Sequence, residues 1–239
     1  MAGARIVWIT GAGSGIGRAL AEEFASHGDS IAATARTLAN LTALQGQIEA
    51  FSGTCEVFQC DISNAEQVRS TAELIGSTLG PVDVLINNAG VTYFKDFLAT
   101  TIAQFDEVMA TNLRGLFLST KAVLPTMLER QSGLIMNVLS YAAKVTYTGS
   151  SVYAASKAGA EAMMNVLRAE TRNKGIKIVN VYPGAVLTPI WHPRHREKYG
   201  HQMMKPAELA KVIYELSCQP PSTVIEDVVI RPQVGDLQV

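Results

Sequence analysis

Three side chains that could transfer a proton lie close together in the second half of the sequence. Tyr153 and Lys157 are four residues apart, so one turn of helix would place them on the same face, and Ser140 lies thirteen residues before Tyr153. A phenol titrates at about 10 when unperturbed, and a neighbouring ammonium group would lower its pKa towards neutrality, where proton exchange is efficient. The three groups could therefore act on one carbonyl oxygen. Because Tyr-x-x-x-Lys is also an ordinary pair on helix surfaces, this prediction depends on the rest of the chain.

A glycine-rich segment near the start of the chain predicts a nucleotide site. Residues 4–10 form a mostly apolar, partly β-branched run typical of a buried strand, and a loop with four glycines follows from Gly11 to Gly17. Residues 18–27 then carry apolar side chains at helical spacing. In a strand, loop and helix of this order, glycines let the backbone approach a pyrophosphate, which lies at the helix N-terminus. A tight turn with no ligand is the alternative.

Strand-like and helix-like segments alternate along the remaining chain. Further strands are expected at residues 30–35, 54–60, 82–86, 133–139, 176–181 and 227–230. Helices are expected at residues 38–51, 65–79, 101–130 with an interruption, 151–173 and 206–218. This alternation predicts an α/β fold in a single domain over residues 1–239: a doubly wound (Rossmann) sheet of seven parallel strands with helices on both faces. Ligands of such sheets bind at the carboxyl ends of the strands.

Composition excludes several classes of protein. The formal net charge is −1, which gives no overall attraction to nucleic acid or to an anionic membrane. No apolar run reaches the roughly 18 residues of a membrane span. The first five residues show no secretory pattern, and the chain has three cysteines, of which Cys55 and Cys60 would point to opposite faces of a strand. We therefore expect reduced thiols, a cytoplasmic location and no nucleic-acid or membrane partner.

Together these motifs resemble the short-chain dehydrogenase/reductase family over nearly the whole chain. The segment from Thr10 to Gly17 matches the family's cofactor loop, and Asn87-Asn88-Ala89-Gly90 matches its motif after the fourth strand. Four residues match the family's catalytic positions in order and spacing: Asn112, Ser140, Tyr153 and Lys157. The resemblance implies an oxidoreductase of the carbonyl reductase or alcohol dehydrogenase type.

The end of the second strand favours NADP(H) over NAD(H). A carboxylate there would bind the ribose 2′-hydroxyl of NAD, but this chain has Ala35 and Arg36, and a guanidinium suits a 2′-phosphate. Arg36 could instead be a solvated loop residue, and Ser14 stands where the family often has a second basic residue. By the resemblance, the other cofactor contacts are Gly11, Ser14, Gly15, Ile16, Gly17, Asp61, Ile62, Asn88, Ala89, Gly90, Tyr153, Lys157, Pro183, Gly184, Val186 and Thr188.

The resemblance also implies roles for these residues. Tyr153 would give its proton to a substrate carbonyl that receives hydride from NADPH, and Ser140 would hydrogen-bond the same oxygen. Lys157 would bind the nicotinamide ribose and reach a water chain through Asn112. Two of the residues have structural alternatives: Asn112 could only satisfy buried backbone groups, and Asp61 could only cap a turn.

The substrate is less constrained than the reaction. Residues 190–205 form a basic, aromatic insert that could close over the cleft as a lid, although such a charge run is more often a solvated surface. Its three histidines lack the spacing of a metal site, so we expect no metal. We expect a small-molecule ketone, aldehyde or alcohol as substrate; the alternatives are a 3-oxoacyl-carrier-protein reductase and an NADP-sensing regulatory protein. We expect a homodimer or homotetramer. The helices at 101–130 and 151–173 contain many small residues, which allow close packing, and members of the family that the chain resembles usually pair through these helices.

Overall fold

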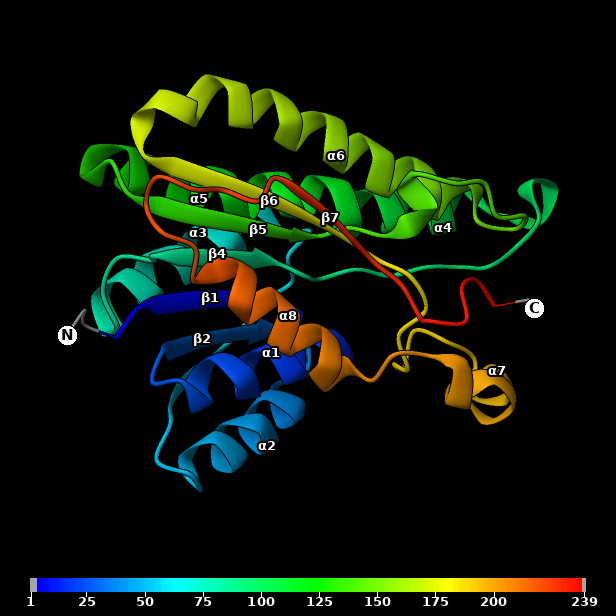
Figure 1. Ribbon diagram of the computed structural model, residues 1–239, viewed down its shortest axis with the longest axis horizontal. Coiled ribbons are helices and arrows are strands. Elements are labelled where there is room, and N and C mark those ends of the chain that lie inside the picture. The colour runs from blue at the N-terminus through cyan, green and yellow to red at the C-terminus, as the bar shows by residue number, and fades with distance from the viewer. Residues whose placement is uncertain (1–3, 238–239) are drawn as a thin grey trace.

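Seven parallel strands form one sheet in the computed structural model, which describes residues 4–237 (Figure 1). The spatial order is β3-β2-β1-β4-β5-β6-β7. The strands are β1 (Ile6–Thr10), β2 (Ser30–Ala35), β3 (Thr54–Gln59), β4 (Val84–Asn87), β5 (Gly133–Val138), β6 (Ile176–Pro183) and β7 (Asp227–Ile230). This order confirms the expected doubly wound fold, and it places a crevice where the two halves of the sheet diverge, between β1 and β4. Residues 1–3 and 238–239 of the expected domain lie outside the described residues.

Helices cover both faces of the sheet (Figure 1). One face packs against α1 (Gly15–Ser26), α2 (Leu38–Glu49) and α8 (Pro206–Ser217), and the other against α3 (Ala65–Thr78), α5 (Gly115–Arg130) and α6 (Ser151–Thr171). The shorter helices are α4 (Ile102–Met109) and α7 (Pro193–Tyr199), with single 3₁₀ turns at Phe97–Ala99, Tyr141–Ala143, Arg172–Lys174 and Gly200–Gln202. In the described part of the chain, no helix has both the length and the apolar character needed to span a membrane.

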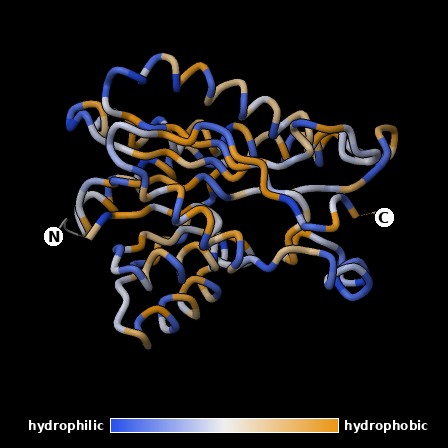
Figure 2. Tube along the Cα trace, viewed as in Figure 1, coloured by the Kyte–Doolittle hydropathy of each residue, from blue (hydrophilic) through white to orange (hydrophobic). Residues whose placement is uncertain are grey.

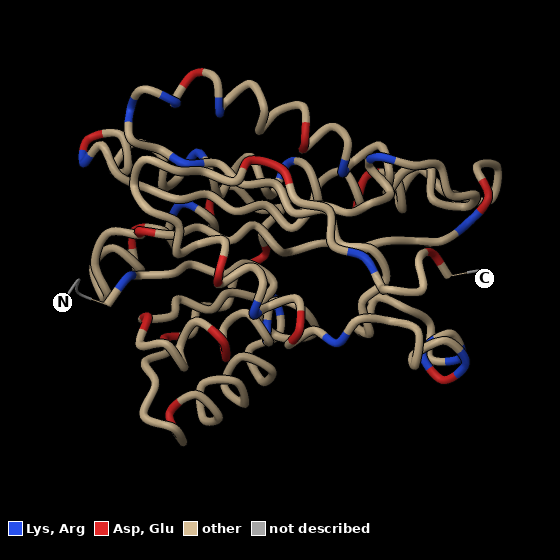
Figure 3. The backbone as a smooth tube through the Cα atoms, in the orientation of Figure 1, with Lys and Arg blue, Asp and Glu red and all other residues tan. Residues whose placement is uncertain are grey.

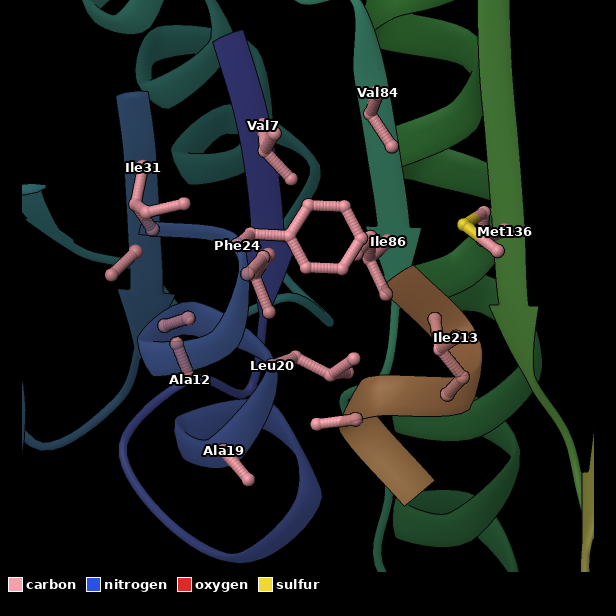
Figure 4. Close-up of a cluster of buried hydrophobic side chains, with 14 of the residues drawn as sticks. Val7, Ala12, Ala19, Leu20, Phe24, Ile31, Val84, Ile86, Met136 and Ile213 are labelled. Carbon is pink, nitrogen blue, oxygen red and sulfur yellow. The ribbon is translucent and has the colours of Figure 1, made fainter. Parts of the chain in front are cut away.

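The core consists of two apolar layers, one on each side of the sheet. Figure 4 shows Phe24 of α1 packed beside Val7 of β1 and Ile86 of β4 on one side. Trp8 belongs to the opposite layer, because successive strand residues point to opposite faces. Cys55 and Cys60 likewise fall in different layers, so the expectation that they point to opposite faces is confirmed. Hydrophobic segments accordingly follow the strands, while α7 is hydrophilic (Figure 2).

The expected elements differ from the structure mainly at their ends. Helix α1 begins at Gly15 and so includes two glycines that the sequence had assigned to the loop. The expected interruption of the helix at 101–130 is a π-helical turn, Ala110–Arg114, between α4 and α5. Strand β6 runs on to Pro183 because it keeps pairing with β7. Helix α7 was not predicted; Pro193 occupies its first turn and the His192 side chain accepts from the backbone N–H of Arg194.

A row of polar side chains crosses four strands. Asn87, Asn137, Asn180 and Asp227 are register partners across β4, β5, β6 and β7. Each amide Nδ2 donates to the next side-chain oxygen, at 3.0, 2.9 and 3.2 Å along the row. Arg168 of α6 contacts the terminal carboxylate, with Nη1 3.3 Å from Asp227 Oδ2. The three asparagines are buried, and the row gives their amide groups partners inside an otherwise apolar sheet.

Candidate functional site

A cleft of about 580 Å³ opens at the carboxyl ends of the central strands. It is lined by most of the residues that the sequence singled out: Gly11, Ser14, Gly15, Ile16, Arg36, Asp61, Ile62, Asn88, Ala89, Gly90, Tyr153, Lys157 and Thr188. Gly17, Asn112, Ser140, Pro183, Gly184 and Val186 do not line it. The cleft therefore joins the glycine loop at one end to the Tyr153 region at the other.

The glycine loop is shaped for an anion. Gly15 has a φ of +55°, which favours glycine, and it begins α1. A Cβ on Gly17 would lie 2.3 Å from the Gly11 carbonyl oxygen, so this glycine allows α1 to pack closely against the loop. The Ser14 side chain caps none of the N–H groups in the first turn of α1. These donors and the helix dipole fit the pyrophosphate of a dinucleotide.

The opposite wall is formed where β2 and β3 end. Arg36 lies at the mouth of the cleft with 59% of its side chain exposed, and its Nη1 is 3.7 Å from Glu107 Oε1. Asp61 Oδ1 accepts hydrogen bonds from the Ser63 backbone N–H at 2.9 Å and from its hydroxyl at 2.7 Å. The turn-capping alternative for Asp61 is therefore observed, and its contact with adenine stays a prediction.

The residues of this wall that were not singled out in the sequence include Thr37, Asn40 and Glu107. Thr37 and Asn40 could have been found, because Thr37 immediately precedes α2 and Asn40 lies in its first turn, directly after β2 at the ligand-binding edge of the sheet. Glu107 could not, because only the packing of α4 in three dimensions brings it near Arg36.

Ser140, Tyr153 and Lys157 meet at the other end of the cleft. The Lys157 ammonium donates to the carbonyl oxygen of Val138 at 2.8 Å and lies 5.9 Å from the centre of the Tyr153 ring. The Ser140 side chain hydrogen-bonds Tyr153, and its Oγ also accepts from the Ala142 backbone N–H at 3.1 Å. Tyr153 and Lys157 thus share one wall of the cleft, as their four-residue spacing predicted, and the Ser140 hydroxyl is hydrogen-bonded to the phenol.

Burial shifts the pKa of two titratable side chains in this group, Tyr153 and Lys157. Burial raises the pKa of Tyr153, and the hydrogen bond with Ser140 offsets only part of that rise. Burial also lowers the pKa of Lys157 from its usual value of 10.5 to about 8. The direction for Tyr153 is opposite to the expected one, because desolvation of the phenolate is the largest effect on its pKa and outweighs the Ser140 hydrogen bond. Tyr153 is therefore a protonated donor at neutral pH.

Asn112 lies in the π-helical turn, and its side chain hydrogen-bonds the backbone of Val91. Its Oδ1 accepts from the Val91 N–H at 2.8 Å, and its Nδ2 donates to the Val91 carbonyl at 2.9 Å and to Ser156 Oγ at 3.0 Å. This is the structural alternative considered for Asn112 in the sequence. The side chain ties the segment after β4 to α6, and the Ser156 hydroxyl donates in turn to the Tyr153 carbonyl at 2.7 Å. A role in a water chain stays a prediction.

The segment after β6 contributes fewer cleft residues than expected. Thr188 is buried, lines the cleft and lies against Gly15, where a Cβ would be 3.2 Å from the threonine side chain. Gly184 packs against the backbone of Arg231, and Val186 is buried in the core and forms a β-bridge with Met204. That bridge closes the base of the insert that carries α7.

Aromatic side chains from two loops gather next to Tyr153. The rings of Phe94 and Trp191 are stacked, with centroids 5.2 Å apart and an interplanar angle of 18°. The Phe94 ring also lies edge-on to Tyr153 at 6.3 Å. Helix α7, which follows Trp191, carries three Lys and Arg residues and one Glu (Figure 3). Over residues 4–237, no cluster of three or more His, Cys, Asp or Glu side chains could hold a metal ion.

Comparison with known proteins identifies the family. The short chain dehydrogenase family model matches residues 5–198. Sepiapterin reductase from Chlorobaculum tepidum is 36% identical over 240 residues, which cover 98% of both chains. D-threitol dehydrogenase from Mycolicibacterium smegmatis is 35% identical over 188 residues, which cover 79% of this chain and 72% of that enzyme.

Solved structures agree with this assignment. A metagenomic short-chain oxidoreductase in complex with NADP matches with a TM-score of 0.85 and 29% identity, covering 97% of this chain and 98% of that one. An alcohol dehydrogenase from the archaeon Thermococcus sibiricus, complexed with 5-hydroxy-NADP, matches with a TM-score of 0.89 and 25% identity, covering 98% and 99%. The chain therefore belongs to the short-chain dehydrogenase/reductase family of NAD(P)-dependent oxidoreductases.

Proposed function

We propose that this protein is an NADP(H)-dependent oxidoreductase that interconverts a ketone or aldehyde with an alcohol. The observation that carries the proposal is that Tyr153, with Ser140 as its hydrogen-bond partner, and Lys157 line a cleft that the glycine loop also lines. When bound there, the nicotinamide dinucleotide supplies hydride to a carbonyl carbon or accepts it from an alcohol. The protein's own residues position the substrate and move the proton.

Tyr153 is the proposed acid and base. An ordinary phenol is already protonated at neutral pH, and burial raises the pKa of Tyr153 further, so Tyr153 can give a proton to a carbonyl oxygen that gains negative charge. Ser140 donates a hydrogen bond to the same oxygen. Lys157, with a pKa of about 8, is mostly charged at neutral pH and stabilises the phenolate that remains. Asn112 is proposed to position Val91 and α6 beside this group.

NADP(H) is the proposed cofactor form. Arg36 lines the cleft directly after β2, where a carboxylate would be needed to bind the ribose 2′-hydroxyl of NAD. Two relatives of known structure contain NADP or a derivative of it. A guanidinium can bind a phosphate through two parallel hydrogen bonds, which supports the preference.

The proposed substrate carries its carbonyl next to a planar ring. Phe94 and Trp191 offer stacked aromatic faces beside Tyr153, and planar rings bind well against such faces. A relative aligned over nearly the whole chain is a sepiapterin reductase, which supports a substrate of this kind. Residues 190–205, which include Trp191, are proposed to act as the lid of the cleft.

The basic surface of α7 favours a second candidate, a 3-oxoacyl-carrier-protein reductase. Arg194 and Lys198 are exposed on this helix, and an acidic carrier protein could dock there (Figure 3). Reduction of a carrier-bound 3-oxoacyl chain in preference to the free thioester would favour this candidate. Binding of NADPH without turnover on any carbonyl would favour the NADP-sensing alternative.

Two copies of the chain are proposed to pair through α5 and α6. An apolar groove of about 520 Å³ between these helices is lined by Leu124, Leu128 and Met163. Phe117 and Val166 beside it are 43% and 59% exposed. Covering this groove with the same surface of a second copy would give a homodimer, and a second contact would give a homotetramer. Light scattering after Val166→Glu should report a smaller assembly.

The replacement Tyr153→Phe tests the proposed chemistry directly. It removes the phenolic proton while keeping the ring that Phe94 contacts. We expect unchanged NADPH binding in a fluorescence titration and a fall in kcat of about 10²- to 10⁴-fold. Undiminished turnover of ketones by the variant would refute the role of Tyr153.

A further inference from the structure

Three side chains from separate segments meet across the mouth of the cleft. Arg36 follows β2, Glu107 is in α4 and Tyr93 follows β4, and all three line the cleft. Glu107 Oε1 is 3.7 Å from Arg36 Nη1, and its other oxygen, Oε2, accepts from the Tyr93 hydroxyl at 2.5 Å. The carboxylate is thus fixed by the phenol on one side and faces the guanidinium on the other.

Glu107 has no evident task in the fold. Its side chain is 39% exposed, and the capping of α4 is provided by Thr101 and Gln104. Asp61, the other carboxylate of the cleft, is turned towards Ser63. Within residues 4–237, Glu107 is therefore the carboxylate that pairs with Arg36.

We propose that Glu107 is a specificity-determining residue for the cofactor, because its carboxylate competes with the 2′-phosphate of NADP(H) for Arg36 while Tyr93 holds it in the competing position. This inference rests on the proposed binding of the 2′-phosphate by Arg36. Glu107 both occupies the guanidinium and repels the phosphate, so it weakens binding of NADP(H). NAD(H) has a neutral 2′-hydroxyl at this place, so the Glu107 charge does not weaken its binding. Glu107 therefore limits the preference that Arg36 creates.

Isothermal titration of NADP⁺ and NAD⁺ against Glu107→Gln tests the competition without requiring turnover. Because exposed ion pairs are weak, we expect NADP⁺ to bind about two- to fivefold more tightly and NAD⁺ to bind unchanged. High salt should shrink the gain. Asp106→Asn is the matched control: it removes the same charge from the neighbouring, exposed position of α4 and should leave both dissociation constants unchanged.

A double-mutant cycle locates the effect. In an Arg36→Ala background, Glu107→Gln should tighten NADP⁺ binding by a smaller factor, because the competition for the guanidinium is gone and only the repulsion between the carboxylate and the phosphate remains to be relieved. Tyr93→Phe releases the carboxylate and should tighten NADP⁺ binding by a smaller factor, which also provides a second variant if Glu107→Gln fails to fold. Weaker NADP⁺ binding by Glu107→Gln, no change, or equal changes for NADP⁺ and NAD⁺ would overturn the inference. Failure of the proposed function looks different: the unmodified protein would bind NAD⁺ at least as tightly as NADP⁺.

Discussion

The ammonium group of Lys157 donates a 2.8 Å hydrogen bond to the carbonyl oxygen of Val138, the last residue of β5. This bond joins α6, which carries Tyr153, to the strand that leads into Ser140. The geometry between the phenol and the serine hydroxyl is therefore set by the sheet as well as by the helix. It also explains how a buried ammonium group obtains a partner far from any carboxylate.

Lys157 should make stability depend on pH. Burial lowers its pKa from 10.5 to about 8, so between these values the unfolded chain binds a proton that the folded protein does not. Stability from this residue therefore increases as pH rises through that window, by up to about 3 kcal/mol. The Lys157→Met variant lacks this titrating group, so its melting temperature relative to that of the unmodified protein should fall as pH rises from about 8 to about 10.5. The exposed Lys121→Met is the control, and a difference that is constant with pH would contradict the prediction.

Gly17→Ala should damage the cofactor loop. The added Cβ would lie 2.3 Å from the Gly11 carbonyl oxygen and 2.4 Å from Asn88 Nδ2, so the loop must move away from α1. We expect a loss of about 1–3 kcal/mol in the free energy of unfolding, measured with urea, and weaker NADPH binding. Gly46→Ala in α2 is the matched control, because its Cβ would meet no atom within 4 Å. Equal stability of the two variants would argue against close packing at Gly17.

Arg36→Ala should separate the two cofactors. Loss of a charged hydrogen bond costs about 1.5–3 kcal/mol, so we expect the KM for NADPH to rise at least about tenfold. The KM for NADH should change little, because it has no 2′-phosphate. Arg69→Ala, which removes an exposed arginine paired with Glu66, should leave both values unchanged. An equal rise for both cofactors would show that Arg36 does not read the phosphate.

Trp191→Ala should change substrate preference. The replacement removes the ring stacked on Phe94, so kcat/KM for ketones joined to a planar ring should fall about tenfold, while small aliphatic ketones should be affected less. NADPH binding should be unchanged. Steady-state assays of cofactor absorbance with both classes of ketone make the comparison. A uniform fall would indicate a general role in shaping the lid.

Local patterns in the sequence were enough to predict the sheet and much of the cleft. The glycine loop is contiguous, and Tyr153 and Lys157 share one helix, so short-range periodicity places these residues correctly. The strand ends then follow from the parallel sheet. An interruption of the helical segment at 101–130 was also expected, but its position at Ala110–Arg114 and its π-helical form were not.

Relations between distant segments could not be predicted in this way. The pairing of Arg36 with Glu107 depends on how α4 packs beside the end of β2. The direction of the Tyr153 pKa depends on how completely the phenol is buried, which four-residue spacing does not determine. Helix α7 lies in a segment whose residues are mostly charged or aromatic, so no apolar period marked it.

The amide row across β4, β5, β6 and β7 affects how accurately the residues that follow these strands are placed. Apolar layers alone would tolerate a strand sliding by two residues, because every side chain would keep its face. Such a slide would separate Asn137 from both neighbouring asparagines and leave buried amides without partners. These amides therefore favour the correct register of the strands during folding. The register in turn determines where Ser140 and Thr188 lie at the edge of the sheet.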